Sequence, residues 1–198
     1  MKKSRLPKTF SLAITLINLL FVSLLQSQNI IDLFLIGNNT TTLMGTYSDG
    51  LRTPRDLDFH KVAGRQNELW VINQNNTGSR NHGGSTVTYY NAGQDSQWAE
   101  YRRDSWSGHF MHTASAIAIS ENGTFANTLD CQDANNNTTG YFSGSTLWDS
   151  DTSVYARVHQ NDSWLGSHID MIHQSPYSEG IASAGGNVYW LFDGFHNA

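Results

Sequence analysis

The sequence has few cysteines, few prolines and no long helical pattern. Of its 198 residues one is cysteine, Cys131, and three are proline. A lone cysteine forms no internal disulfide, so stability has to come from packing. We interpret Cys131 as a partly buried thiol, with a catalytic thiol as the alternative. No segment after residue 30 keeps apolar residues at helical spacing over three turns, which argues against a helical bundle.

The first 28 residues have the order of a secretory signal peptide. Met1–Lys8 carries four cations and no acid, Phe10–Leu25 is mostly apolar, and Gln26–Gln28 forms a short polar end. A single membrane anchor is the alternative, but the apolar run is short for a span of about 20 residues and holds several polar residues. The sequence therefore predicts a secreted or periplasmic chain, with residues 29–50 as a lead-in segment.

Loss of the signal peptide makes the remaining chain more acidic. The whole chain has a formal net charge of −5, and four cations leave with the signal peptide, which gives −9. No run of basic residues remains. Because phosphate neutralisation dominates nucleic-acid affinity, we expect no nucleic-acid partner. We also expect no stable membrane association after cleavage.

Short runs of strand type are what the sequence has instead of helices. Asn, Gly, Ser and Thr are abundant, and aromatic residues reach 12%. Turn pairs such as Asn122-Gly123 and Gly185-Gly186 separate the runs, which is typical of hairpins. The fold class that this composition predicts is all-β. The expected strands are 57–59, 69–72, 86–90, 116–119, 124–129, 145–148, 154–158, 180–182 and 188–192.

Three stretches, 53–73, 112–130 and 175–194, repeat one pattern. Each has a short strand centred on an aliphatic residue (Leu57, Ile117 or Ile181), then a turn and a second strand. The first two continue into a third strand after Gly-Ser-Thr and into a candidate fourth strand, near 98–101 and 154–158. Four short antiparallel strands per repeat is the pattern of a β-propeller blade. A β-sandwich with coincidental spacing is the alternative.

Two of these stretches resemble NHL-type propeller repeats. "TPRDLDFH…ELWVIN" and "SPYSEGIA…GNVYWLFDG" share a small or proline start, an aliphatic anchor and an aromatic second strand. The resemblance covers residues 51–197 and implies an NHL-repeat-type β-propeller, a neighbour of the lactonase-like six-bladed propellers. About two and a half four-stranded blades are present, starting near residues 53, 112 and 175. We therefore expect residues 51–198 to be a partial β-propeller, truncated from a six-bladed ring.

The starts of the inner strands carry the candidate ligand-binding residues. In a propeller these starts face the mouth of the central channel, and the repeat places Arg55, Asp56, Ser115 and Glu179 there. Such a polar set predicts a site for a small ligand or an ion. The alternative is an ordinary solvated rim, in which Arg55 and Asp56 satisfy backbone groups.

Histidines form two groups, each just before an inner strand. His109 and His112 precede one strand, and His168, Asp170 and His173 precede the next. Imidazole and carboxylate together suit a divalent metal, Zn²⁺ or Ca²⁺. The alternative is a structural or solvent-facing role, and the residues specify no cofactor with certainty.

The resemblance also implies what an enzyme of this group would need. Amidating-lyase propellers carry Pro-His-Gly at the start of an inner strand, where this sequence has Pro54-Arg55-Asp56. Lactonase-like propellers hold a divalent ion with Glu, Asn and Asp, for which Glu179 is a candidate. The sequence contains no nucleophile elbow and no phosphate loop, so the catalytic residues are unknown.

The main functional hypothesis is therefore a secreted propeller domain that serves as a binding scaffold without catalysis of its own. Its expected partner is a protein, a small molecule or a carbohydrate at one rim. Exposed tryptophans and tyrosines beside Asn and Asp would suit stacking on sugars, although blade cores also consume aromatics. The alternative is a metal-dependent propeller hydrolase or lyase that acts on a small ester, lactone or peptide end.

Overall fold

The structure is a computed structural model that describes residue 37 and residues 42–74, 83–130, 144–156, 166–172 and 177–194. The chain divides into two compact units, Met1–Leu43 and Met44–Ala198. Everything below concerns the second unit. Within the described residues, no helix has both the length and the apolar character that crossing a membrane requires.

Nearly all of the regular structure is β, as the composition predicts. Two short helical pieces, η1 (Tyr47–Asp49) and α3 (Ser107–Phe110), are the helices of the described residues. The strands are β1 (Pro54–Phe59), β2 (Leu69–Asn73), β3 (Ser85–Tyr90), β4 (Trp98–Arg102), β5 (Ala114–Ile119), β6 (Thr124–Leu129), β7 (Ser145–Asp149), β8 (His168–Ile172), β9 (Ser178–Gly185) and β10 (Val188–Asp193).

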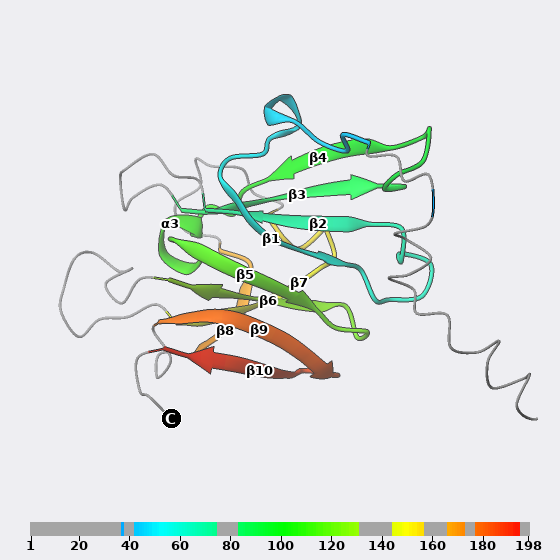
Figure 1. The fold of residues 1–198 in the computed structure, drawn as a ribbon. Coiled ribbons are helices and arrows are strands. Elements are labelled where there is room, and N and C mark those ends of the chain that lie inside the picture. The colour runs from blue at the N-terminus through cyan, green and yellow to red at the C-terminus, as the bar shows by residue number, and fades with distance from the viewer. Residues whose placement is uncertain are drawn as a thin grey trace, which may run out of the picture. The chain divides into compact units, whose positions relative to one another are not determined.

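The strands form three antiparallel sheets in chain order (Figure 1). The first sheet has the order β1-β2-β3-β4 and the second the order β5-β6-β7-β8, while β9 and β10 form a two-stranded hairpin. Each strand pairs with its neighbour in sequence, and none of the sheets closes on itself. The prediction of two four-stranded antiparallel units followed by a partial third is confirmed at this level.

The fourth strand of the second sheet is not where the sequence analysis placed it. That strand is β8, whereas residues 154–156 of the predicted 154–158 strand form a turn, and 157–158 lie outside the described residues. Asp151 starts this turn: its carbonyl accepts the N–H groups of Val154 and Tyr155 at 2.9 and 2.7 Å. Tyr155 is fully buried in the core, so the apolar alternation of this segment serves a packed turn.

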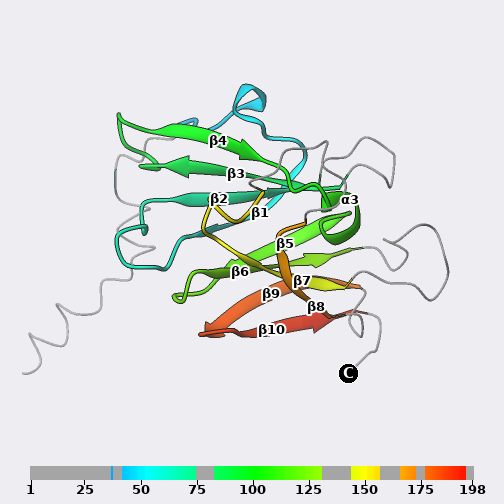
Figure 2. The same ribbon diagram turned by 180° about the vertical axis from the view of Figure 1, so that it is seen from behind.

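The first strands of the three sheets lie next to one another. Strand β1 contacts β5, and β5 contacts β9, so that successive sheets stand side by side with their first strands in a row. Figure 2 shows the same order from behind. This arrangement brings together the polar residues that start each first strand, although Asp56 and Ser115 are 59 positions apart in the sequence and Ser115 and Glu179 are 64 apart.

An aromatic core fills the space between the two four-stranded sheets. Trp70 of β2 contacts Phe125 of β6 at 5.3 Å between ring centroids, and Phe125 contacts Tyr155 edge-on at 5.0 Å. Trp148 of β7 stacks on Phe125 at 6.1 Å. Offset and edge-on pairs of this kind are the favoured geometries of aromatic rings. The described part of the chain thus joins its first two sheets through large buried rings.

A second, smaller core lies on the other face of the first sheet. Val71, Val87 and Tyr89 are buried there, and Met44 and Leu51 from the segment before β1 pack against them. The first sheet is therefore covered on both faces across β2, β3 and part of β4.

Candidate functional site

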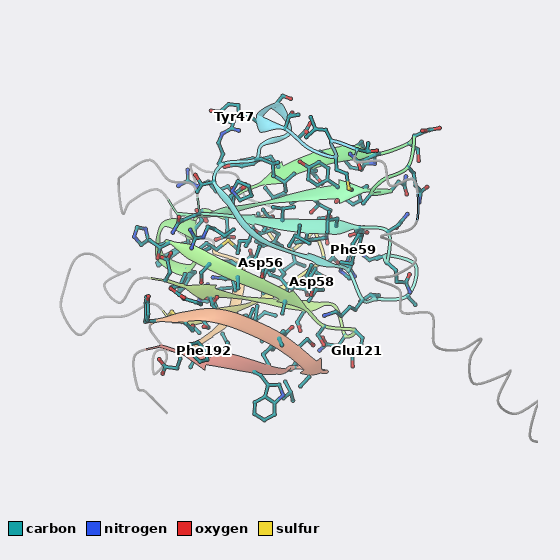
Figure 3. The ribbon with its side chains drawn as sticks, in the orientation of Figure 1. Tyr47, Asp56, Asp58, Phe59, Glu121 and Phe192 are labelled. Atoms are coloured by element: carbon teal, nitrogen blue, oxygen red, sulfur yellow. The ribbon has the colours of Figure 1, made fainter. Side chains whose placement is uncertain are left out.

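Among the described strands, β1, β5 and β9 each pair with a single partner, so each has one edge that no other described strand pairs with. Side chains from the preceding sheet cap the free edge of β5. Asp56 Oδ2 accepts the N–H of Ile117 at 3.0 Å, and Asp58 Oδ2 accepts the N–H of Ile119 at 2.8 Å. Figure 3 labels both aspartates on β1, above β5. The two carboxylates thus accept main-chain N–H groups that the carbonyls of a neighbouring strand would otherwise accept. These hydrogen bonds link the two sheets at their first strands.

The junction between β5 and β9 uses hydroxyl groups instead. Ser115 Oγ donates to the carbonyl of Ser178 at 2.9 Å and lies 2.8 Å from Thr128 Oγ1. At the other end of β5, Ser120 Oγ donates to the carbonyl of Gly186 at 2.5 Å. The hairpin is therefore attached to the second sheet at both ends of β5.

The four predicted rim residues fall into two groups. Asp56 and Ser115 are used in the contacts between sheets, while Arg55 and Glu179 point their charged groups to the surface. The Arg55 guanidinium lies 3.4 Å from Asp130, and Glu179 accepts the Tyr177 hydroxyl at 2.9 Å. That hydrogen bond raises the pKa of Tyr177. All four residues lie on three adjacent strands, and two of them, Arg55 and Glu179, are exposed.

A shallow groove of about 320 Å³ runs along the edges of the three first strands. Its charged lining comes from β1 and the residues just after it, and its apolar lining comes from all three strands. The lining residues are Asp56, Leu57, Asp58, Lys61, Ile117, Ala118, Ile181, Ala182 and Ser183. Asp58 was not among the predicted residues, although its position two residues after Asp56 places both carboxylates on one face of the strand.

A buried polar network joins the loop after β1 to the end of β7. The His60 ring lies 2.8 Å from Ser150 Oγ through Nε2, and its Nδ1 accepts the N–H of Val62 at 3.2 Å. Because Nδ1 is an acceptor, Nε2 carries the hydrogen and donates it to Ser150. His60 therefore has no free acceptor nitrogen for the Ser150 proton, and the pair does not have the geometry of a nucleophile and its base.

Arg65 also belongs to this network, and its charge helps to lower the pKa values of His60 and Glu68. Its guanidinium makes two hydrogen bonds to the Glu68 carboxylate, at 2.9 and 2.8 Å, and also reaches Ser150 Oγ at 3.2 Å. Burial, with the nearby Arg65 charge in second place, lowers the pKa of His60 to about 4. Burial alone would raise the pKa of Glu68, but the Arg65 and Trp70 hydrogen bonds outweigh it and the pKa falls.

Of the two predicted histidine groups, the structure describes the side chains of His112, His168 and Asp170. The His168 ring packs on Phe110 at 3.7 Å between centroids, on the side of β8 that faces the aromatic core. Asp170 lines a cavity on the hairpin side of the same strand. His112 is buried before β5, while the His109 side chain and His173 lie outside the described residues. Where the structure is described, no three His, Cys, Asp or Glu side chains come together as a metal site.

A cavity that the sequence analysis did not anticipate lies between the second sheet and the hairpin. It has a volume of about 350 Å³ and mostly apolar walls. Ala126 and Leu147 of the sheet face Tyr189 and Leu191 of β10 across it, and Asp170 stands at its polar side. Small side chains at positions such as Ala126 leave this space open, which no pattern in a single strand reveals.

Comparison of the chain with protein-family models, with curated proteins and with solved structures gave no match.

Proposed function

We propose that this chain is a binding scaffold built from β-propeller blades, without catalysis of its own, that holds a polar ligand at the rim formed by the starts of β1, β5 and β9. One observation carries the proposal: the first strands of the three sheets stand side by side, and the groove along them is lined by Asp56, the residue after Arg55. In a propeller the first strands line the central channel, and ligands bind where loops and strand ends meet at its mouth.

The contacts of the four rim residues favour a binding function over a catalytic one. Asp56 and Ser115 hold sheets together, so they are not free to transfer protons or to attack a substrate. Arg55 and Glu179 offer a cation and an anion at the surface, one from β1 and one from β9. Such a pair matches a ligand with both donors and acceptors, and carbohydrate is the class that we propose first.

The chain is also proposed to be exported. The order of basic, apolar and polar segments in residues 1–28 supports a signal peptide that is cleaved. Outside the cell, a rim that binds carbohydrate would be able to reach its ligand. Sequencing of the N-terminus of the protein recovered from the medium or periplasm tests this part separately.

The binding proposal is tested by thermal unfolding of the purified chain in a series of neutral and acidic oligosaccharides. A ligand that binds only the folded state raises Tm with its concentration. We expect Arg55→Ala and Glu179→Ala each to remove the increase, and Arg103→Ala, which changes an arginine that donates to Ser107 of α3, to keep it. Metal-dependent turnover of an ester, lactone or peptide that disappears in Glu179→Ala would overturn the non-catalytic assignment.

A further inference from the structure

The outer face of the β9–β10 hairpin carries large apolar side chains that the described chain leaves uncovered. Val188, Trp190 and Phe192 alternate along β10 and are 57, 71 and 70% exposed. Tyr189 and Leu191 point the other way and line the cavity against the second sheet, and Val188, next to a β-bulge, reaches the wall of that cavity as well. The hairpin therefore has one packed face and one open apolar face. Open apolar faces of this kind mark contact sites.

The open face of the hairpin corresponds to a face of the first sheet that is buried in an interface. Trp190 and Phe192 pair with β9 in the same way that Trp70 and Ile72 of β2 pair with β1, as the second strand of their unit. Trp70 and Ile72 are fully buried, because the second sheet packs on them. The hairpin thus presents the same half of an interface, with no sheet against it.

The first sheet, at the other end of the row of sheets, carries a surface that could pack against the open face of the hairpin. Leu57 and Phe59 of β1 are 55 and 48% exposed, on the face that points away from the second sheet. The same positions of β5 are Ile117 and Ile119, which are 3 and 0% exposed because they pack in the core with Trp70. Met44 and Leu51 cover the rest of that face, which leaves β1 open. Figure 3 labels Phe59 on β1 and Phe192 on β10.

We propose that a second copy of this chain binds head to tail, with the hairpin face of one copy (Val188, Trp190, Phe192) on the β1 face of the next (Leu57, Phe59). The contact repeats the first-strand part of the interface between the first and second sheets, in which Trp70 and Ile72 of a second strand meet Ile117 and Ile119 of a first strand. It joins two different surfaces, so it is heterologous and allows a ring or a longer array. This inference does not depend on the ligand proposed for the rim.

The test measures the mass of the purified full chain by light scattering over a series of concentrations. We expect the wild type to exceed its 22.1 kDa monomer mass and to grow with concentration. Leu57→Asp and Trp190→Asp should each give a monomer, because each blocks one half of the interface. Both side chains are more than half exposed, so both variants should fold, and circular dichroism checks that they do. The apolar run at residues 10–25 is common to all variants and cannot explain a difference between them.

Mixing the two monomeric variants separates this arrangement from a symmetric one. Leu57→Asp keeps an intact hairpin face and Trp190→Asp keeps an intact β1 face, so a mixture should form a one-to-one dimer that grows no further. Ile169→Asp, which changes a 53% exposed residue of β8 outside both faces, should associate like the wild type. A monomeric wild type overturns the proposal. So does an association that Leu57→Asp leaves intact, or a mixture that stays monomeric.

Discussion

The carboxylate of Asp58 on β1 accepts the main-chain N–H of Ile119 on β5 at 2.8 Å, and so bonds the first sheet to the free edge of the second. With Asp56 and Ile117 it forms a pair of such bonds two residues apart on each strand. The junction between these sheets thus combines an aromatic core with charged caps on main-chain donors.

Replacement of Asp58 by alanine should weaken this junction. The N–H of Ile119 would lose its acceptor, and hydrogen bonds to charged groups contribute about 1–3 kcal/mol, so we expect the free energy of unfolding to fall by about that amount. Urea denaturation measures it. Asp95→Ala, at an exposed turn aspartate, is the matched control and should change stability little. Equal effects of both substitutions would contradict the capping role.

His60 should make stability depend on pH. Its folded pKa of about 4 lies below the ordinary value of 6.5, so between these values the unfolded chain binds more protons than the folded one. The contribution of His60 is therefore complete above pH 6.5 and is lost as the pH falls from 6.5 towards 4. His168, whose pKa burial also lowers, acts in the same direction.

The variant His60→Gln separates the His60 contribution from that of His168. It removes the ionisation and keeps a donor for Ser150, so denaturant midpoints measured across this pH range should fall less steeply than those of the wild type. An unchanged slope would show that His60 is protonated at its ordinary pKa in the folded state.

Gly84 should not tolerate a side chain. A Cβ at this position would lie 2.5 Å from the carbonyl oxygen of Asn73 and 2.7 Å from that of Met111, both main-chain atoms that cannot move aside. We expect Gly84→Ala to lower stability by about 2 kcal/mol or more, in the range of overpacked cores. Gly180→Ala is the control, since its Cβ would meet only Phe192 at an ordinary 3.6 Å. Thermal unfolding compares the two.

The cavity beside the hairpin should accept a larger side chain. Ala126 is a buried strand residue on its wall, and Ala126→Val adds apolar volume with a side chain that suits a strand. We expect a gain of about 0.5–2 kcal/mol, as for other cavity-filling changes. A loss of stability in urea denaturation would mean that the space is filled by solvent or a ligand in solution.

The strands and the repeat could be predicted from the sequence because both depend on local signals. Alternation around Leu57 and Ile117, and the turn pairs between runs, are properties of neighbouring residues. Residues 154–156 were wrongly predicted as part of a strand because their alternation resembles that of a strand, whereas the chain turns at Asp151 and the Tyr155 side chain lies in the core. Strand β8 carries the same kind of short run, but its pairing with β7 depends on a distant partner.

The candidate site was predictable only in part. Counting from the anchors placed Asp56 and Ser115 on adjacent first strands, which the structure has. Their use as caps between sheets follows from the direction in which the β5 and β9 main-chain groups point, and single-strand patterns do not encode that direction. The cavity at Ala126 arises from the sizes of side chains on two sheets at once, so it too required the packed structure.

Hydrogen exchange at the capped edge of β5 can report on the contact between the first two sheets. Edge amides normally exchange their hydrogens with solvent quickly, but those of Ile117 and Ile119 are held by aspartates of another sheet. Their exchange rates therefore register separation of the two sheets even while every ladder inside each sheet stays intact. Two backbone positions can in this way follow separation of the first two sheets independently of unfolding.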